Sequence, residues 1–77
     1  MKSDRKTEIP DIVIKLGIKI SQIITIKGLK QRNVAHDAGL DVENLRKYIK
    51  GKQEMKISTM ERIALALEVS IEELFNF

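Results

Sequence analysis

The sequence predicts an all-α fold, a bundle of five short helices. Apolar residues recur at intervals of three and four along five segments, at about 11–27, 31–38, 42–50, 57–67 and 71–76. Glycine stands after three of these segments, where a left-handed residue ends a helix: Gly28, Gly39 and Gly51. Apolar pairs of the hydrophobic-staple type bracket four of the helix starts: Leu29 with Val34, Leu40 with Leu45, Met55 with Met60, and Val69 with Leu74.

Residues 1–10 precede this pattern and have no apolar periodicity. We expect them to form a flexible N-terminal arm, with residues 11–77 as the single folded domain. A basic arm can also reach a DNA minor groove, here through Lys2, Arg5 and Lys6.

The first helix carries conflicting signals. Its many isoleucines favour a strand, and Gly17 costs a helix about 1 kcal/mol. The spacing of Val13, Leu16, Ile20 and Ile23 nevertheless predicts a helix, which starts near Asp11, after a first-turn proline, or only near Leu16. Four further isoleucines exceed the needs of one small core and suggest a subunit contact: Ile12, Ile14, Ile18 and Ile26.

Capping residues set the later helix starts. Asp41 can cap the third helix through its carboxylate, and Ser70 with Glu73 forms a capping box for the fifth. A rival box, Ser58 with Glu61, leaves the start of the fourth helix open by two residues. The expected core is Ile20, Ile23, Leu29, Val34, Ala35, Ala38, Leu40, Leu45, Ile49, Met60, Ile63, Ala64, Leu67, Val69, Ile71 and Leu74.

Composition narrows the class of protein. A chain of 77 residues makes one domain, and without cysteine it has neither a disulfide nor a thiolate metal site. We expect a cytoplasmic protein, since neither a signal peptide nor a membrane span is recognisable. The net charge of +3 permits a nucleic-acid partner. All but one of the lysine and arginine residues precede residue 57, so the positive charge is concentrated in that part of the chain.

A catalytic site has little support in the sequence. His36 is the single histidine, and the glycines form neither a GxGxxG nor a GxxxxGK phosphate loop. Tyr48 is expected to be a packing residue. We therefore expect no enzyme, no metal site and no cofactor.

Two short segments, QRNVAHDA and VENLRKYIK, are separated only by Gly39, Leu40 and Asp41, which is the helix-turn-helix arrangement. Residues 16–75 resemble the five-helix, lambda-repressor-like or Xre-type helix-turn-helix family. The resemblance is carried by Leu29, Gln31, Val34-Ala35, Gly39, Lys50-Gly51-Lys52, the run Ile63 to Ser70, and Leu74.

The resemblance implies double-stranded DNA as the partner and a reading helix at 42–50. Carried over by position, the residues that meet base edges are Val42, Glu43, Asn44, Arg46 and Lys47. Those that meet phosphates are Gln31, Lys50 and Lys52.

The chain also departs from the family pattern. Lys30 replaces a usual capping Ser or Thr, Ile49 a common glutamate, and Met55 a common proline. Glu43 bears directly on binding, because an acidic residue on the reading face repels phosphate unless it meets a cytosine.

Two functions follow as hypotheses. The first is a sequence-specific transcriptional regulator that acts as a homodimer, with its subunit contact at the surplus isoleucines or at Leu74, Phe75 and Phe77. The second is a protein-interaction module on the same scaffold, such as an antitoxin-like subunit with a protein partner.

Overall fold

The computed structural model describes residues 9–77, in which there are five α-helices and no strand. The helices are α1 (Asp11–Ile26), α2 (Gln31–Asp37), α3 (Val42–Ile49), α4 (Ile57–Leu67) and α5 (Ile71–Leu74). The all-α prediction is confirmed, and each helix ends within two residues of its expected range. The expected arm contacts, Lys2, Arg5 and Lys6, lie outside the described residues.

The helix α1 begins at Asp11, directly after Pro10, so the longer of the two alternatives is correct. The carbonyl oxygen of Pro10 accepts from the N–H of Val13 at 3.0 Å, and the Asp11 carboxylate lies at the positive end of the helix dipole. Helical spacing prevails over the β-propensity of the isoleucines because it gathers one apolar stripe on the core side. The buried residues of that stripe are Val13, Leu16, Gly17, Ile20, Ile23 and Ile24.

The predicted caps are confirmed in part. Asp41 is the N-cap residue of α3, but its side chain accepts no hydrogen bond, so the expected carboxylate cap is wrong. The backbone alone begins α3, with the Asp41 carbonyl accepting from the N–H of Leu45 at 3.1 Å. At α5, Ser70 Oγ accepts from the N–H of Glu73 at 3.2 Å, which is one half of the predicted capping box, while the Glu73 carboxylate lies 3.5 Å from Lys19 Nζ.

The start of α4 is also settled. Its N-cap residue is Lys56, and Ser58 lies within the first turn. The rival capping box at Ser58 and Glu61 is therefore wrong, and the staple pair Met55 and Met60 marks the correct start.

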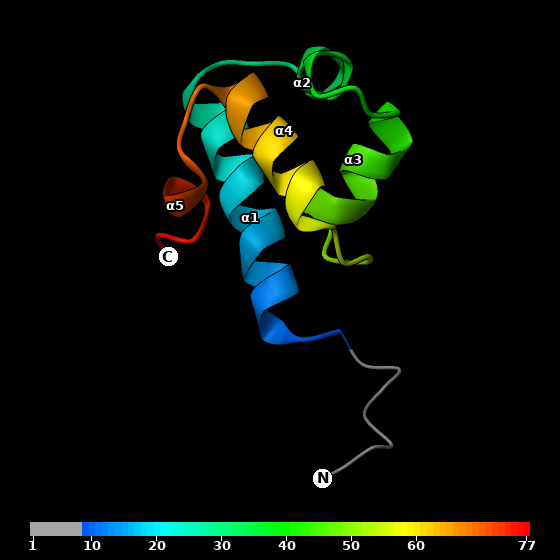
Figure 1. The fold of residues 1–77 in the computed structure, drawn as a ribbon, viewed down its shortest axis with the longest axis vertical. Helices are drawn as coiled ribbons and strands as arrows, with labels where there is room; N and C mark the ends of the chain where they lie inside the picture. The colour runs from blue at the N-terminus through cyan, green and yellow to red at the C-terminus, as the bar shows by residue number, and fades with distance from the viewer. Residues whose placement is uncertain (1–8) are drawn as a thin grey trace, which may run out of the picture.

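The helices are arranged around α1 and α4 (Figure 1). The pair α2 and α3 lies on one side, where α3 packs on α1 and α2 packs on both α3 and α4. The short α5 lies on the other side, against α1 and α4, and brings the C-terminus there. This leaves the outer surface of α3 uncovered.

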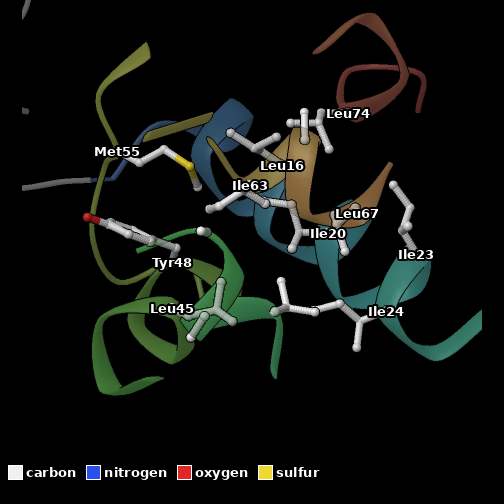
Figure 2. Close-up of a cluster of buried hydrophobic side chains, with 14 residues drawn as sticks. Leu16, Ile20, Ile23, Ile24, Leu45, Tyr48, Met55, Ile63, Leu67 and Leu74 are labelled. Carbon is white, nitrogen blue, oxygen red and sulfur yellow. The ribbon is translucent and has the colours of Figure 1, made fainter. Parts of the chain in front are cut away.

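The core fills the space between the helices (Figure 2). Five large side chains, one or more from every helix except α2, are almost completely buried: Ile20, Leu45, Ile63, Leu67 and Leu74. α2 adds Val34 and Ala35, two small side chains that let it approach its neighbours closely. A core contributed by all five helices makes the position of α3 depend on the whole domain.

Most of the predicted core is confirmed, with one error. Leu29 is 39% exposed, because it lies in the connection between α1 and α2, where its N–H donates to the Ile24 carbonyl at 2.9 Å. Its backbone thus ends α1 while its side chain stays outside. The structure adds to the core five buried residues that the expected list left out: Val13, Leu16, Ile24, Tyr48 and Met55. Expected residues that are half-buried and pack against the core are Leu40, Ile49, Met60, Val69 and Ile71.

A membrane-spanning helix is not found in the part of the chain that the structure describes: no helix between residues 9 and 77 is both long enough and apolar enough.

Candidate nucleic-acid interface

The helix α3 has one buried and one exposed face. Leu45 is completely buried and Tyr48 nearly so, and these two side chains hold the helix to the core (Figure 2). Glu43, Asn44 and Lys47 are exposed on the opposite face. Because residues three and four apart share a helix face, these side chains form a continuous polar surface.

The turn before α3 sets its direction. Gly39 adopts a left-handed conformation with φ of +71°, and the N–H of Leu40 donates to the Ala35 carbonyl of α2 at 2.8 Å. This closes α2 and reverses the chain within three residues, so that Asp41 begins the next helix. The predicted helix-turn-helix geometry is present.

The other end of α3 is held against α1 at Gly17. A Cβ atom on this glycine would lie 2.6 Å from the Ile49 carbonyl oxygen and closer still to that of Tyr48. The sequence interpretation treated Gly17 only as a cost to the helix and missed this role. Its signal was a lone glycine inside a strong helical pattern, which often marks a close backbone approach.

Two lysines flank the glycine that ends α3. Gly51 has φ of +69°, and its N–H donates to the Tyr48 carbonyl at 3.0 Å. Lys50 and Lys52 are both exposed on either side of this turn. Both predicted phosphate contacts are therefore free to meet a polyanion.

The beginning of α2 meets the reading face through one arginine. Arg46 Nε donates to Gln31 Oε1 at 3.2 Å, and Arg46 Nη1 donates to Glu43 Oε2 at 3.2 Å. The Gln31 contact joins residues fifteen positions apart, and sequence reasoning gave no sign of it. The Glu43 contact follows the helical i, i+3 spacing and could have been predicted.

The structure thus brings the predicted site residues together around α3. The exposed ones are Glu43, Asn44, Lys47, Lys50 and Lys52, and the half-buried ones are Gln31, Val42 and Arg46. Glu43, the single anion of this set, is paired with Arg46, which leaves Lys47, Lys50 and Lys52 as unpaired cations among the described residues. Such a surface favours an anionic partner.

The family model for the Cro/C1-type helix-turn-helix DNA-binding domain matches residues 19–77. The chain belongs to this family. A Bacillus subtilis (strain 168) protein, the SPbeta prophage-derived uncharacterized HTH-type transcriptional regulator YopO, is 31% identical over 58 residues, which are 75% of this chain and 83% of the relative.

Solved structures agree with this assignment. The restriction-modification controller protein C.AhdI from Aeromonas hydrophila has a TM-score of 0.82 and 27% identity, over 86% of this chain and all of its own. The clp gene regulator ClgR from Corynebacterium glutamicum, with a TM-score of 0.81 and 20% identity over 86% of this chain and 70% of its own, shares the fold. The predicted five-helix, lambda-repressor-like fold and the Xre-type resemblance are confirmed.

In this Cro/C1-type domain the three departures from the family pattern have visible consequences. Lys30 is the N-cap residue of α2 and gives it no side-chain hydrogen bond. Met55 is buried in the core, and Ile49 packs against it from its edge. Without a capping side chain at Lys30, α2 begins with backbone hydrogen bonds alone. Met55 and Ile49 add apolar contact to the core.

The histidine and the acidic side chains are not gathered at one site in the described part of this Cro/C1-type domain. His36 is exposed, with Nδ1 lying 3.7 Å from Asp37 Oδ1. Between residues 9 and 77, no group of three histidine, aspartate or glutamate side chains is placed to hold a metal ion.

Proposed function

We propose that this protein is a transcriptional regulator that reads a specific DNA sequence by placing α3 in the major groove. The observation that carries the proposal is the exposed face of α3, where Glu43, Asn44 and Lys47 stand together. Gln31 lies at one side of this face, with Lys50 and Lys52 just beyond its end. The chain is proposed to have no enzymatic activity.

Each residue has a defined part in this proposal. Lys47 donates to guanine O6 or N7, Glu43 accepts from cytosine N4, and Val42 contacts a thymine methyl group, with Asn44 and Arg46 beside them. Gln31, Lys50 and Lys52 bind phosphates and fix the orientation of α3 in the groove.

The experiment is selection and sequencing from a pool of random duplexes at two salt concentrations, followed by binding measurements on the enriched sequence. We expect one enriched motif whose affinity falls with salt. Lys47→Ala should change the base preferred at one position of that motif, whereas Lys27→Ala, on the side of the domain near α5, should leave the motif unchanged. No enrichment at either salt concentration would contradict the proposal.

A homodimer is the second part of the proposal, with half-sites about 34 Å apart on DNA. Leu74 was a candidate for the contact, but it is fully buried in its own domain, so that expectation is wrong. Phe75 and Phe77 remain exposed, with ring centroids 6.3 Å apart, and Phe75 lines a cleft together with Ile12 of α1. This aromatic end of the domain is the face that we propose for the second copy.

Sedimentation equilibrium tests the dimer. Phe77→Asp should lower the molar mass to that of one chain, and Leu65→Asp, on the exposed face of α4, should not. Dissociation by Leu65→Asp instead would place the contact on α4. A monomeric wild-type protein at micromolar concentration would contradict the homodimer.

The protein-interaction module remains a second candidate because the exposed apolar residues are spread over more than one face. Ile18 and Ile26 of α1 line a groove with Ile49, and this groove shares no residue with the cleft at Phe75. Ile57 and Leu65 are exposed on α4. Weak DNA binding that tightens when a protein partner is added would favour this candidate. In that case Lys47→Ala would have little effect on partner binding.

A further inference from the structure

One side-chain hydrogen bond joins two helices in the part of the chain that the structure describes, and it lies at the reading face. It is the contact from Arg46 of α3 to Gln31 of α2. The same guanidinium contacts Glu43 one turn earlier in α3. Arg46 therefore connects a residue proposed to bind phosphate with one proposed to read a base.

The chemistry of Arg46 fixes how the Gln31 amide is turned. A guanidinium has only donors, so only the amide oxygen of Gln31 can face it. The amide nitrogen, with its two N–H groups, is then on the other side of the group. Only that nitrogen can donate to a phosphate oxygen, and the reversed amide would turn its oxygen toward the phosphate.

Arg46 also changes the charge of the reading face. Glu43 is 68% exposed in its side chain, and an unpaired carboxylate there would repel the DNA backbone. The Arg46 Nη1 atom lies 3.2 Å from its Oε2 atom, so the pair carries no net charge. The net charge of this face is then the positive charge of Lys47, Lys50 and Lys52, which attracts DNA.

We propose that Arg46 is a positioning residue, which turns the Gln31 amide toward phosphate and neutralises Glu43, and that this is its role in place of the base contact expected for it. The inference rests on the proposed function, because it assigns the means by which that site meets DNA. Arg46 is suited to this role because its planar fork holds two partners at once, which a lysine cannot do with its single ammonium group.

The first test is a double-mutant cycle of Arg46→Ala and Gln31→Ala, measured on the enriched duplex and on a scrambled one. Gln31→Ala should weaken binding about tenfold, as for a hydrogen bond to a charged group, and equally on both duplexes. Arg46→Ala should weaken it about thirtyfold, because it also exposes the charge of Glu43. The double variant should bind about as weakly as Arg46→Ala alone. A double loss of about three hundredfold, the product of independent effects, would overturn the inference, as would a loss by Arg46→Ala at one base position only.

The second test concerns Glu43. Glu43→Gln should strengthen binding to the scrambled duplex in the Arg46→Ala background, by about threefold for one relieved surface charge. The affinity should then match that of Gln31→Ala, because only the effect on the Gln31 amide remains. No gain would show that Glu43 does not repel DNA once Arg46 is removed, and would overturn the neutralising role.

Arg62→Ala is the matched control, because it removes an arginine from α4 whose one side-chain hydrogen bond among the described residues goes to Thr59 of its own helix. Its affinity should stay within about twofold of wild type. A loss as large as that of Arg46→Ala would attribute both effects to net charge and overturn the inference.

Arg46→Lys keeps the positive charge and should still bind less tightly than wild type. Wild-type affinity in the Arg46→Lys variant would attribute the role of Arg46 to charge alone and overturn the inference.

A measurement on the free protein covers the case in which Arg46→Ala does not fold. In nuclear magnetic resonance spectra, Gln31→Ala should shift the Arg46 Nε–H signal and speed its exchange with water. An unmoved signal would overturn the inference. The two proposals fail differently. If the wild-type protein selects DNA but the losses of Arg46→Ala and Gln31→Ala are additive, only the role of Arg46 is contradicted. If the wild-type protein selects no DNA, both the proposed function and this role are contradicted.

Discussion

Gly17 in the middle of α1 lies directly against Ile49 at the end of α3, so that a Cβ atom at Gly17 would stand 2.6 Å from the Ile49 carbonyl oxygen. Both partners are backbone, which cannot yield as a flexible side chain can. The position of the proposed reading helix therefore depends on the missing side chain of one residue in another helix.

Gly17→Ala should destabilise the domain by about 2 kcal/mol, because overpacking against α3 outweighs the gain of about 1 kcal/mol in helix propensity. Urea unfolding measures the change. Thr25→Ala, at an exposed position of the same helix, is the control and should be neutral or slightly stabilising. A stabilised Gly17→Ala variant would show that α1 and α3 are not in close contact.

Gly51→Ala should cost about 2 kcal/mol, from the left-handed φ of +69° and from a Cβ atom 3.1 Å from the Ile14 Cγ1 atom. Gly28→Ala is its control, because φ there is +67° and nothing lies within 4 Å of the added atom. That variant should lose only the backbone term, about 1 kcal/mol. If thermal unfolding gives the two variants equal losses of stability, contact with Ile14 does not restrict the side chain at position 51.

Ser70→Ala should destabilise the domain by about 1 kcal/mol, because the hydroxyl that caps α5 is lost. The effect reaches the core, since α5 carries the fully buried Leu74. Ser58→Ala, inside α4, should change the free energy of unfolding by less than about 0.5 kcal/mol. The opposite ranking in chemical unfolding would restore the capping box at Ser58.

Leu45→Ala should cost about 3 kcal/mol, because Leu45 has no exposed surface and fixes α3 to the core. Leu65→Ala removes the same atoms from a side chain that is 69% exposed, and should cost less than about 0.5 kcal/mol. Calorimetric unfolding of the two variants compares them. Similar losses would contradict the assigned faces of α3 and α4.

Lys52→Ala should weaken DNA binding on all sequences alike and lower the dependence of log affinity on log salt by about 1, since one phosphate contact disappears. Lys27→Ala removes an equal charge beside α5 and should leave that slope unchanged. Fluorescence anisotropy titrations over a range of salt concentrations measure both. An unchanged slope for Lys52→Ala would remove this residue from the DNA-binding surface.

Much of the fold could be predicted from particular residues. The apolar stripe of α1, the capping serine of α5 and the three turn glycines placed the helices to within two residues. The hydrophobic staples predicted apolar contacts for Leu29 and Met55 alike, yet Leu29 is exposed and Met55 is buried. Both lie in connections where no helical period applies. Which of them is buried depends on which helix covers the connection.

The sequence by itself determined which residues form helices and which of them share the exposed face of α3, because the helical period and the capping preferences act over a few neighbouring residues. Only the tertiary structure decided that α3 packs against α1 at Gly17 and that Arg46 reaches Gln31. These contacts join residues far apart in the chain. Their distances are set by how whole helices pack, which no local pattern specifies.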